Sequence, residues 1–319
     1  MSRYKIKKKK VPNLYAPKKI IKLYGRIGFG IHADTEYLLN ILKEMNEVPY
    51  GGIIVIDFSN VDFLYPSGLN TIVCTGINLL DKNRFIKQID PKNREVSDFL
   101  DYSGFRDIVG IGIRDSKIQQ PDTTYKIHSF DNVDDNEISK LVDIIEKELN
   151  MSLSVKNRIH ENIAELIMNT VHHSESKSNC YVIGQAYPTS NHIRYCIADA
   201  GIGIKEHLSR NNQDIYKKST CEVIRFATEY GVTGNPKENS GIGLNDLKEL
   251  VYACGGSFRI LSEDGFYEEE IENDGKRKIN MKMLDFNIHG TFIDVVLNNN
   301  PDYKIYLKDE IPNEFNLLE

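Results

Sequence analysis

Glu165 and Asn169 stand four residues apart in a stretch with the pattern of a helix. At that spacing the two side chains share one helix face. Ile159, Ile163 and Ile167 repeat at the same interval on a neighbouring stripe, which can dock the helix on a sheet. A carboxylate one turn from a carboxamide suits a site that orients water and holds Mg²⁺ through oxygen ligands. A solvated helix face gives the same spacing, so this pair alone does not decide between the two.

Asp199 follows directly after an apolar run, Ile193 to Ala198, that predicts a strand. Gly201 and Gly203 come next, and backbone without side chains lets a ligand approach closely. A carboxylate in this position can accept a hydrogen bond from an exocyclic amine such as that of adenine. A plain tight turn after a strand is the alternative interpretation.

Two further pieces contain glycine. Ser240-Gly-Ile-Gly-Leu244 begins an apparent helix, where glycines leave backbone N–H groups open at the positive end of the helix dipole. That arrangement can bind an anion. His289-Gly-Thr-Phe292 leads into the last predicted strand. Taken singly, each piece is also compatible with an ordinary loop junction.

The order and spacing of these four pieces closely resemble the ATP-binding domain of the GHKL superfamily, which includes gyrase, histidine kinases, mismatch-repair ATPases and anti-sigma factor serine kinases. The residues that match its boxes are, in chain order, Glu165 and Asn169, then Asp199, Gly201 and Gly203, then Gly241 and Gly243, and finally Gly290 and Thr291. The resemblance covers about residues 137 to 297 and is strongest to the anti-sigma factor serine kinases. It implies an α/β sandwich of the Bergerat type.

The resemblance also implies a role for each matched residue. Glu165 would be the general base that activates water or a hydroxyl, and Asn169 would coordinate Mg²⁺. Asp199 would bind the adenine amine, partly through water, in a loop opened by Gly201 and Gly203. Thr291 would support the adenine end of the site.

The phosphate end would be formed by the second glycine box. Gly241 and Gly243 would offer backbone donors to the phosphates, and Ser240 would add a hydroxyl donor. The stretch Lys205 to Asn239 would be the ATP lid, since its length and polarity suit a mobile loop that nucleotide orders.

The first half resembles the STAS domain, the fold of anti-sigma factor antagonists, in Asp57 to Leu69 and Asn93 to Asp107. It departs from that family where the family carries an Asp and then its phosphoacceptor Ser, because Tyr65 and Pro66 stand there. Ser67 is either a shifted acceptor or the cap of the following helix, which we favour. We therefore expect the STAS-like half to be a recognition surface and not a substrate.

Alternating strand and helix patterns position these motifs. In the first half we expect strands at residues 20–24, 53–56 and 84–89, and helices at residues 33–45, 67–79 and 96–108. In the second half we expect helices over 137–173 with a break near Asn150, a helix over 243–252, and strands at 181–187, 193–198, 257–262 and 291–297. Residues 263–288 have the pattern of a charged hairpin insertion around Asp264-Gly265 and Asp274-Gly275.

A chain of 319 residues suggests two α/β domains. The boundaries that we predict are a basic flexible tail at 1–16, the STAS-like domain at 17–115, a linker at 116–136, the ATP-binding domain at 137–298 and a polar tail at 299–319. A net charge of −6 argues against a nucleic-acid partner. The five cysteines form no CxxC pair, which favours a reducing cytoplasm, and no apolar run approaches the ~20 residues of a membrane helix.

Together these patterns predict a cytoplasmic regulatory protein that binds ATP and Mg²⁺. The expected activity is that of an ATPase or of a serine/threonine protein kinase. The alternative is a non-catalytic switch in which nucleotide controls protein interactions of the STAS-like half. The expected partners are ATP and a protein such as a regulatory factor, with a homodimer as one option and no membrane.

Overall fold

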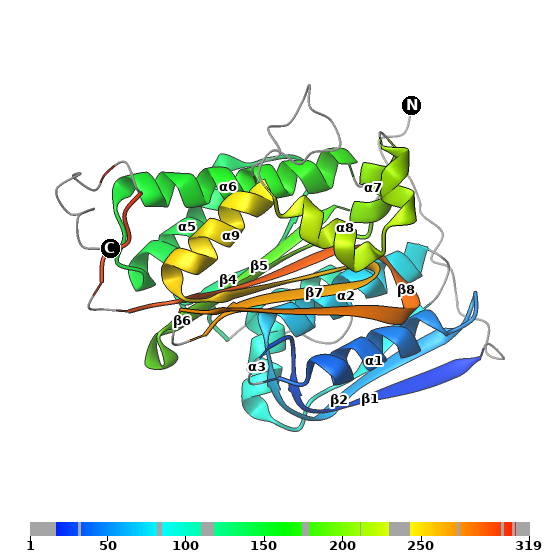
Figure 1. Ribbon diagram of the computed structural model, residues 1–319. Coiled ribbons are helices and arrows are strands. Elements are labelled where there is room, and N and C mark those ends of the chain that lie inside the picture. The colour runs from blue at the N-terminus through cyan, green and yellow to red at the C-terminus, as the bar shows by residue number, and fades with distance from the viewer. Residues whose placement is uncertain are drawn as a thin grey trace, which may run out of the picture.

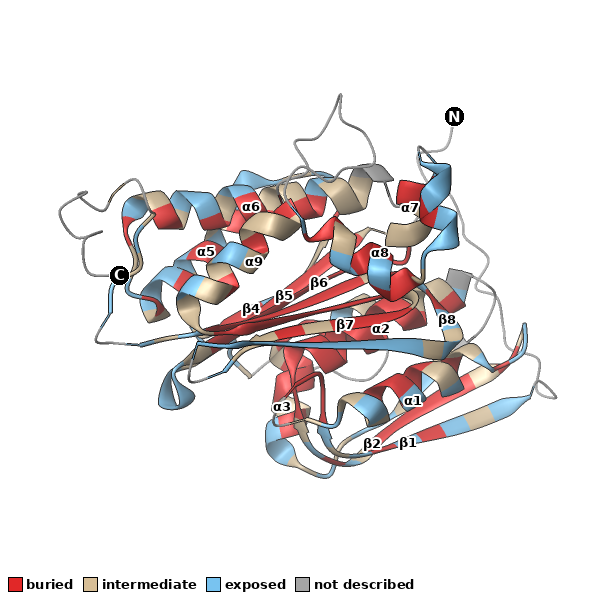
Figure 2. Cartoon of the chain, in the orientation of Figure 1, coloured by how far each residue is buried: buried red, intermediate tan, exposed pale blue. Residues whose placement is uncertain are grey.

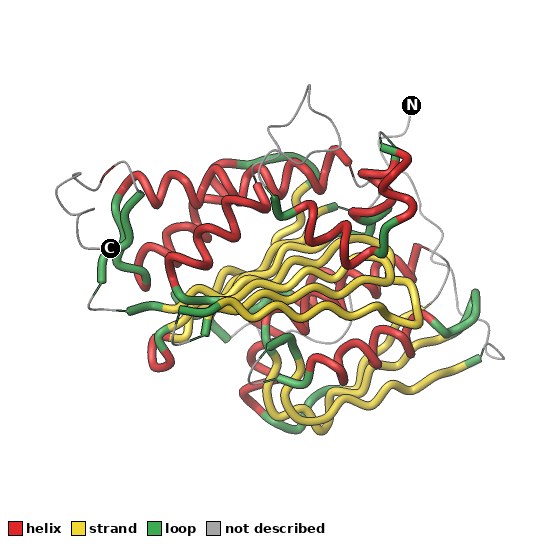
Figure 3. The backbone as a smooth tube through the Cα atoms, in the orientation of Figure 1, coloured by secondary structure: helices red, strands yellow, loops and turns green. Residues whose placement is uncertain are grey.

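A computed structural model describes residues 17–30, 33–81, 85–109, 118–173, 179–210, 212–229, 243–272, 275–300, 303–307 and 310. The fold is mixed α/β, with a parallel sheet in the first half and an antiparallel sheet in the second (Figure 1). Figure 3 shows the two sheets as separate layers with helices between and above them. In this described part, no helix combines the length and the apolar character needed to cross a membrane. The basic tail expected at 1–16 lies outside it.

Strands and helices alternate in the first half, where the sheet order is β1-β2-β3. The elements are β1 (Lys18–Ile27), α1 (Thr35–Asn46), β2 (Ile53–Leu64), α2 (Pro66–Asp81), β3 (Phe85–Ile89), α3 (Arg94–Tyr102) and α4 (Phe105–Val109). All the elements predicted here are present, and β1 and β2 are longer than expected. The helix predicted over 96–108 is two helices, because Gly104 takes a φ of +81° between them.

The second half has a five-stranded sheet in the order β4-β5-β6-β8-β7. Its elements are β4 (Thr124–Phe130), α5 (Asp135–Glu148), α6 (Leu153–His173), β5 (Cys180–Tyr187), β6 (His192–Ala198), α7 (Ile204–Ser209), α8 (Thr220–Ala227), α9 (Gly243–Cys254), β7 (Ser257–Ile271) and β8 (Arg277–Asn298), with two 3₁₀ turns, Pro188–Ser190 and Gln213–Lys217. The helix break predicted near Asn150 is confirmed.

The prediction of a linker at 116–136 is wrong for the residues that form β4. This strand pairs with β5 at the edge of the second sheet, and Tyr125, Ile127 and Phe130 are buried. The Ile127 N–H also donates to the Ser103 carbonyl at 2.7 Å. Polar residues between the three apolar ones obscure the strand pattern, while tertiary contacts on both sides stabilise it.

Helix α2 lies between the two sheets (Figure 1), and every residue from Pro66 to Gly76 is buried (Figure 2). The Asn70 amide donates to the carbonyls of Tyr181 and Cys196, at 2.9 and 3.1 Å, and so fastens α2 to the second sheet. One hydrophobic core contains residues of α2 together with residues of β5, β6 and β8. Helices α5, α6, α8 and α9 cover the opposite face of that sheet (Figure 1). The two halves therefore share a core, which the sequence pattern did not indicate.

After Ser262 the chain folds back along the first part of β7, so that the Ile271 N–H donates to the Gly256 carbonyl at 3.0 Å. The second part of β7 then pairs with the first part of β8 as a hairpin at the edge of the sheet. Ion pairs join it to α1, between Lys43 and Asp285 and between Glu36 and Lys282. The hairpin predicted within 263–288 is present, and the chain turns at both predicted places, at Glu263-Asp264 just before Gly265 and again near Gly275. The first turn also interrupts the β7–β8 pairing. This irregularity matters for the site, because it lies beside the loop that follows β6.

Candidate functional site

Helix α6 carries the pair Glu165 and Asn169, and both side chains are half-buried. The neighbouring isoleucine stripe is buried in the core of the second half, as predicted, at Ile159, Ile163 and Ile167. Glu165 faces the beginning of α9: a Cβ built on Gly243 would lie 3.2 Å from Glu165 Cδ. The structure therefore brings Glu165 together with one glycine of the second glycine box.

Two further contacts hold the start of α9 against α6. The buried Asn162 amide donates to the Gly243 carbonyl at 2.6 Å. Arg158 Nε lies 2.8 Å from an Asp246 carboxylate oxygen. Burial raises the pKa of Asp246, Arg158 opposes the rise, and the nearby Glu165 carboxylate adds to it. Glu165 is thus placed among fixed charges and backbone, not on a freely solvated helix face.

Asp199 lies at the end of β6 with only 4% of its surface exposed. Its carboxylate accepts a hydrogen bond from the Gly201 N–H at 2.6 Å, and the Thr291 N–H donates to it as well. Burial outweighs these two bonds and raises the pKa of Asp199 to about 7. A buried carboxyl group costs folding free energy, and a pKa shifted close to neutral pH is typical of a functional site.

The loops around Asp199 require glycine at two positions. Gly290 has a φ of +98°, and a Cβ there would lie 1.9 Å from the Asp199 carbonyl oxygen. Gly203 has a φ of +90°, and a Cβ there would lie 2.5 Å from the Glu263 side chain. Only glycine fits both the torsion and the space. The D-x-G-x-G piece and the final Gly-Thr piece are therefore packed directly on each other.

Ser262, next to the irregularity of β7, fastens these loops together. Its hydroxyl accepts from the Ile204 N–H at 3.0 Å and lies 3.0 Å from the Gly290 carbonyl, to which it donates. It also lies 3.2 Å from the Thr291 hydroxyl. Sequence reasoning missed Ser262, because it stands in no motif.

The thiol of Cys180 interacts both with Asp199 and with Thr170 of α6. The Asp199 carboxylate helps to raise the pKa of the Cys180 thiol, although burial is the larger cause, and Thr170 hydrogen-bonds that thiol. Thr170 follows Asn169 on α6. Ser240 and Gly241 lie outside the described residues.

The stretch from Lys205 to Asn239, predicted as a mobile loop that forms the lid, is not an irregular loop in its first part. Residues 205–210 and 212–229 are folded into α7, the 3₁₀ turn and α8, with a capping box at Ser219 and Glu222. These elements pack on one another through an apolar cluster of Leu208, Ile215, Val223 and Ala227. Residues 230–239 lie outside the described part. Many charged and polar residues separate these four apolar residues along the chain, so the sequence pattern does not indicate that the segment folds.

Ser67 is fully buried at the start of α2. Its hydroxyl accepts from the Phe29 N–H at 3.2 Å, across from the end of β1, and not from its own helix as the cap interpretation predicts. It also acts on the buried Asp294 of β8, whose pKa burial raises and the Ser67 hydroxyl lowers. In this arrangement the Ser67 hydroxyl is out of reach of a phosphorylating site.

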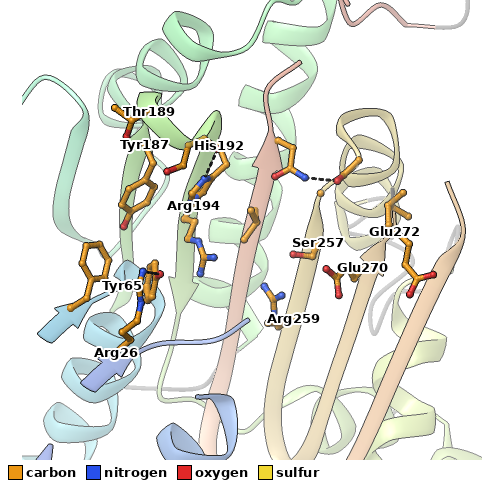
Figure 4. Close-up of a pocket in the computed structure, with 17 residues that line it drawn as sticks. Arg26, Tyr65, Tyr187, Thr189, His192, Arg194, Ser257, Arg259, Glu270 and Glu272 are labelled. Carbon is orange, nitrogen blue, oxygen red and sulfur yellow. Dashed lines mark hydrogen bonds between the residues drawn. The ribbon is translucent and has the colours of Figure 1, made fainter. Parts of the chain in front are cut away.

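Sequence reasoning also missed a cavity of about 830 Å³ between the two halves (Figure 4). Arginines and aromatic rings from β1, β2, β5, β6 and β7 line it. These strands are far apart in the chain, so no local spacing marks the cavity.

A comparison of the chain with models of known protein families finds no match, and a comparison with curated proteins finds no significant relative.

Proposed function

We propose that the second half of this protein binds Mg²⁺-ATP and transfers its γ-phosphoryl group to a protein serine or threonine, or to water. The observation that carries the proposal is Asp199, a buried carboxyl at a strand end with a pKa of about 7. An adenine amine is a neutral donor that would satisfy this acceptor where solvent does not reach. The order of the motifs and the packing of Gly290 on Asp199 support the same ligand.

The remaining residues fit the chemistry of phosphoryl transfer, in which positioning and charge stabilisation do most of the work. Glu165 would take the proton of the attacking hydroxyl or water. The Asn169 amide oxygen suits Mg²⁺, which takes few protein ligands and prefers oxygen. When bound, that ion would neutralise charge on the phosphates. Gly243, beside Glu165, would offer its backbone to the phosphate end.

A nucleotide-controlled interaction switch is the second candidate, and the buried Ser67 favours it. Because the first half presents no accessible hydroxyl at Ser67, it would act as a recognition surface for a regulatory protein or for a second copy of the chain. Helix α2 touches both sheets, so a change around the second sheet has a direct route to the first half. A cytoplasmic location belongs to this same proposal.

The test uses ATP labelled with radioactive phosphorus in its γ-phosphate, with Mg²⁺ and with a chelator in parallel. Released phosphate indicates an ATPase, and label on a protein indicates a kinase. Calorimetry on the same samples shows binding without turnover, the result expected of a switch. An ATP titration with no heat and no protection from thermal unfolding would overturn the proposal.

A further inference from the structure

The cavity between the two halves lies at the opposite end of β6 from Asp199. Strand β6 begins at His192, which lines the cavity, and Asp199 follows its last residue. The seven residues of β6 span roughly 20 Å at the rise of a strand. Among the residues that the structure describes, none of the proposed ATP site lines the cavity. An inference about the cavity is therefore independent of the proposed function.

Aromatic rings form one wall of this cavity. Tyr187 and His192 are stacked with their centroids 4.7 Å apart and their planes inclined by 20°. Phe63 and Tyr65 follow, with centroids 4.6 Å apart. Figure 4 shows Tyr187 and His192 above Tyr65 on the same side of the cavity. Such a wall favours a planar ring over an aliphatic chain.

Arg194 supplies a buried positive charge on this wall, with only 3% of its surface exposed. Its guanidinium lies 4.3 Å from the centre of the Tyr65 ring, and one nitrogen donates to the Phe29 carbonyl at 2.9 Å. Among the described residues, its Nε has no hydrogen-bond partner. That nitrogen is shielded from solvent, and the Arg194 charge also lowers the pKa of the buried Asp294. A ligand oxygen would therefore meet the part of the Arg194 guanidinium that lines the cavity.

The other charges of the cavity limit the ligand further. Arg259 is occupied, since it pairs with Glu268 at 2.7 Å and with Asp294 at 3.2 Å. Arg26 lies at the rim, stacked against Phe63 and Tyr65, and meets no carboxylate among the described residues. Glu270 and Glu272 line the other side.

Two carboxylates facing two available guanidinium groups disfavour a ligand with several negative charges. The volume of about 830 Å³ is in the range of small-molecule sites. We propose that this cavity binds a small molecule that carries one planar aromatic ring and one carboxylate. The ring stacks along the aromatic wall, and the carboxylate accepts from the exposed Arg26 at the rim and from the part of the Arg194 guanidinium that lines the cavity.

The test compares three probes by calorimetry: 4-hydroxybenzoate, cyclohexanecarboxylate, which keeps the charge but lacks the aromatic ring, and phenol, which keeps the ring but lacks the charge. We expect 4-hydroxybenzoate to bind with a Kd below about 1 mM and the other two to bind about tenfold more weakly or less. Saturating ATP should not displace it. No binding of 4-hydroxybenzoate, equal binding of cyclohexanecarboxylate, or displacement by ATP would each overturn the proposal.

Variants then locate the site. Arg194→Gln should weaken 4-hydroxybenzoate binding about tenfold, whereas Arg94→Gln, whose side chain is 90% exposed on α3, should not change it. Thermal unfolding shows whether Arg194→Gln is folded. If Arg194→Gln is not folded, Arg26→Gln at the exposed rim is measured in its place, and we expect it to bind 4-hydroxybenzoate more weakly than the wild type. Unchanged affinity in a folded Arg194→Gln protein, or in Arg26→Gln when that variant decides, contradicts the proposal.

Discussion

Gly290 lies directly against the backbone of Asp199, so closely that a Cβ on Gly290 would come within 1.9 Å of the Asp199 carbonyl oxygen. The turn before β8 and the loop after β6 therefore fit together only through this glycine. Since the Thr291 N–H also donates to the Asp199 carboxylate, the same contact orients the proposed adenine acceptor.

Gly290→Ala should destabilise the fold by about 3 kcal/mol or more, because the substitution combines a positive φ with a backbone collision. It should also remove ATP binding from whatever fraction stays folded. Gly275→Ala is the matched control, since Gly275 has a φ of +78° but open space around its Cβ position. That control should lose only about 1 kcal/mol. Thermal melting of both variants decides, and equal losses would contradict the packing described.

ATP binding should become tighter as the pH rises through 7. Burial raises the pKa of free Asp199 to about 7, and an amine donor stabilises its ionised form, so the complex has the lower pKa. Binding below pH 7 must therefore expel a proton, which weakens affinity by up to about tenfold per pH unit. Calorimetry across the neutral range measures this. A dissociation constant that stays constant with pH in the wild type would exclude Asp199 from the contact.

Asp199→Asn should weaken ATP binding and yet stabilise the free protein at alkaline pH. The unfolded carboxyl ionises near its ordinary value of 3.8, whereas the folded one keeps its proton up to about 7. Stability from this group is therefore fully present below pH 3.8 and is lost as the pH rises through 7. The Asn variant avoids that loss, so its melting temperature should exceed that of the wild type above neutrality. Asp122→Asn, an exposed aspartate, should change neither property.

Glu165→Gln should reduce turnover of ATP by about 10²- to 10⁴-fold, the usual contribution of a general base. Nucleotide affinity should change little, since the proposed contacts to ATP come from other residues. Glu161→Gln removes the same charge one turn earlier on α6, where Glu161 is exposed, and should keep its activity. A similar fall in both variants would point to the charge of the helix and not to proton transfer.

Limited proteolysis without nucleotide should spare residues 212–229. The apolar cluster that includes Leu208, Ile215 and Val223 holds this segment folded, and a protease cuts only chain that has opened. Mass spectrometry of the early fragments identifies the first sites. Rapid cleavage within α8 in the free protein would restore the interpretation of the whole stretch as a mobile lid.

The local patterns of the chain were sufficient for most helices and strands. The α5–α6 break near Asn150, the helix face shared by Glu165 and Asn169, and the strands before Asp199 and after Gly290 all follow from periodicity and turn residues. Two ordered segments were predicted to be irregular because their local patterns are weak. In β4, and in α7 to α8, few apolar residues are scattered among many polar ones, so only their tertiary partners make them ordered.

The tertiary structure alone decided which of these pieces meet and what surrounds them. Helix α2 is buried because a sheet packs on each side of it, and Ser67 at its start is fully buried. Asp199 owes its pKa of about 7 to burial. Arg194 acquires its aromatic neighbours from strands far away in the chain. Spacing along a sequence records which side chains share one helix or strand face. Desolvation and contacts between distant segments depend on how whole elements pack, and they have no local counterpart in the sequence.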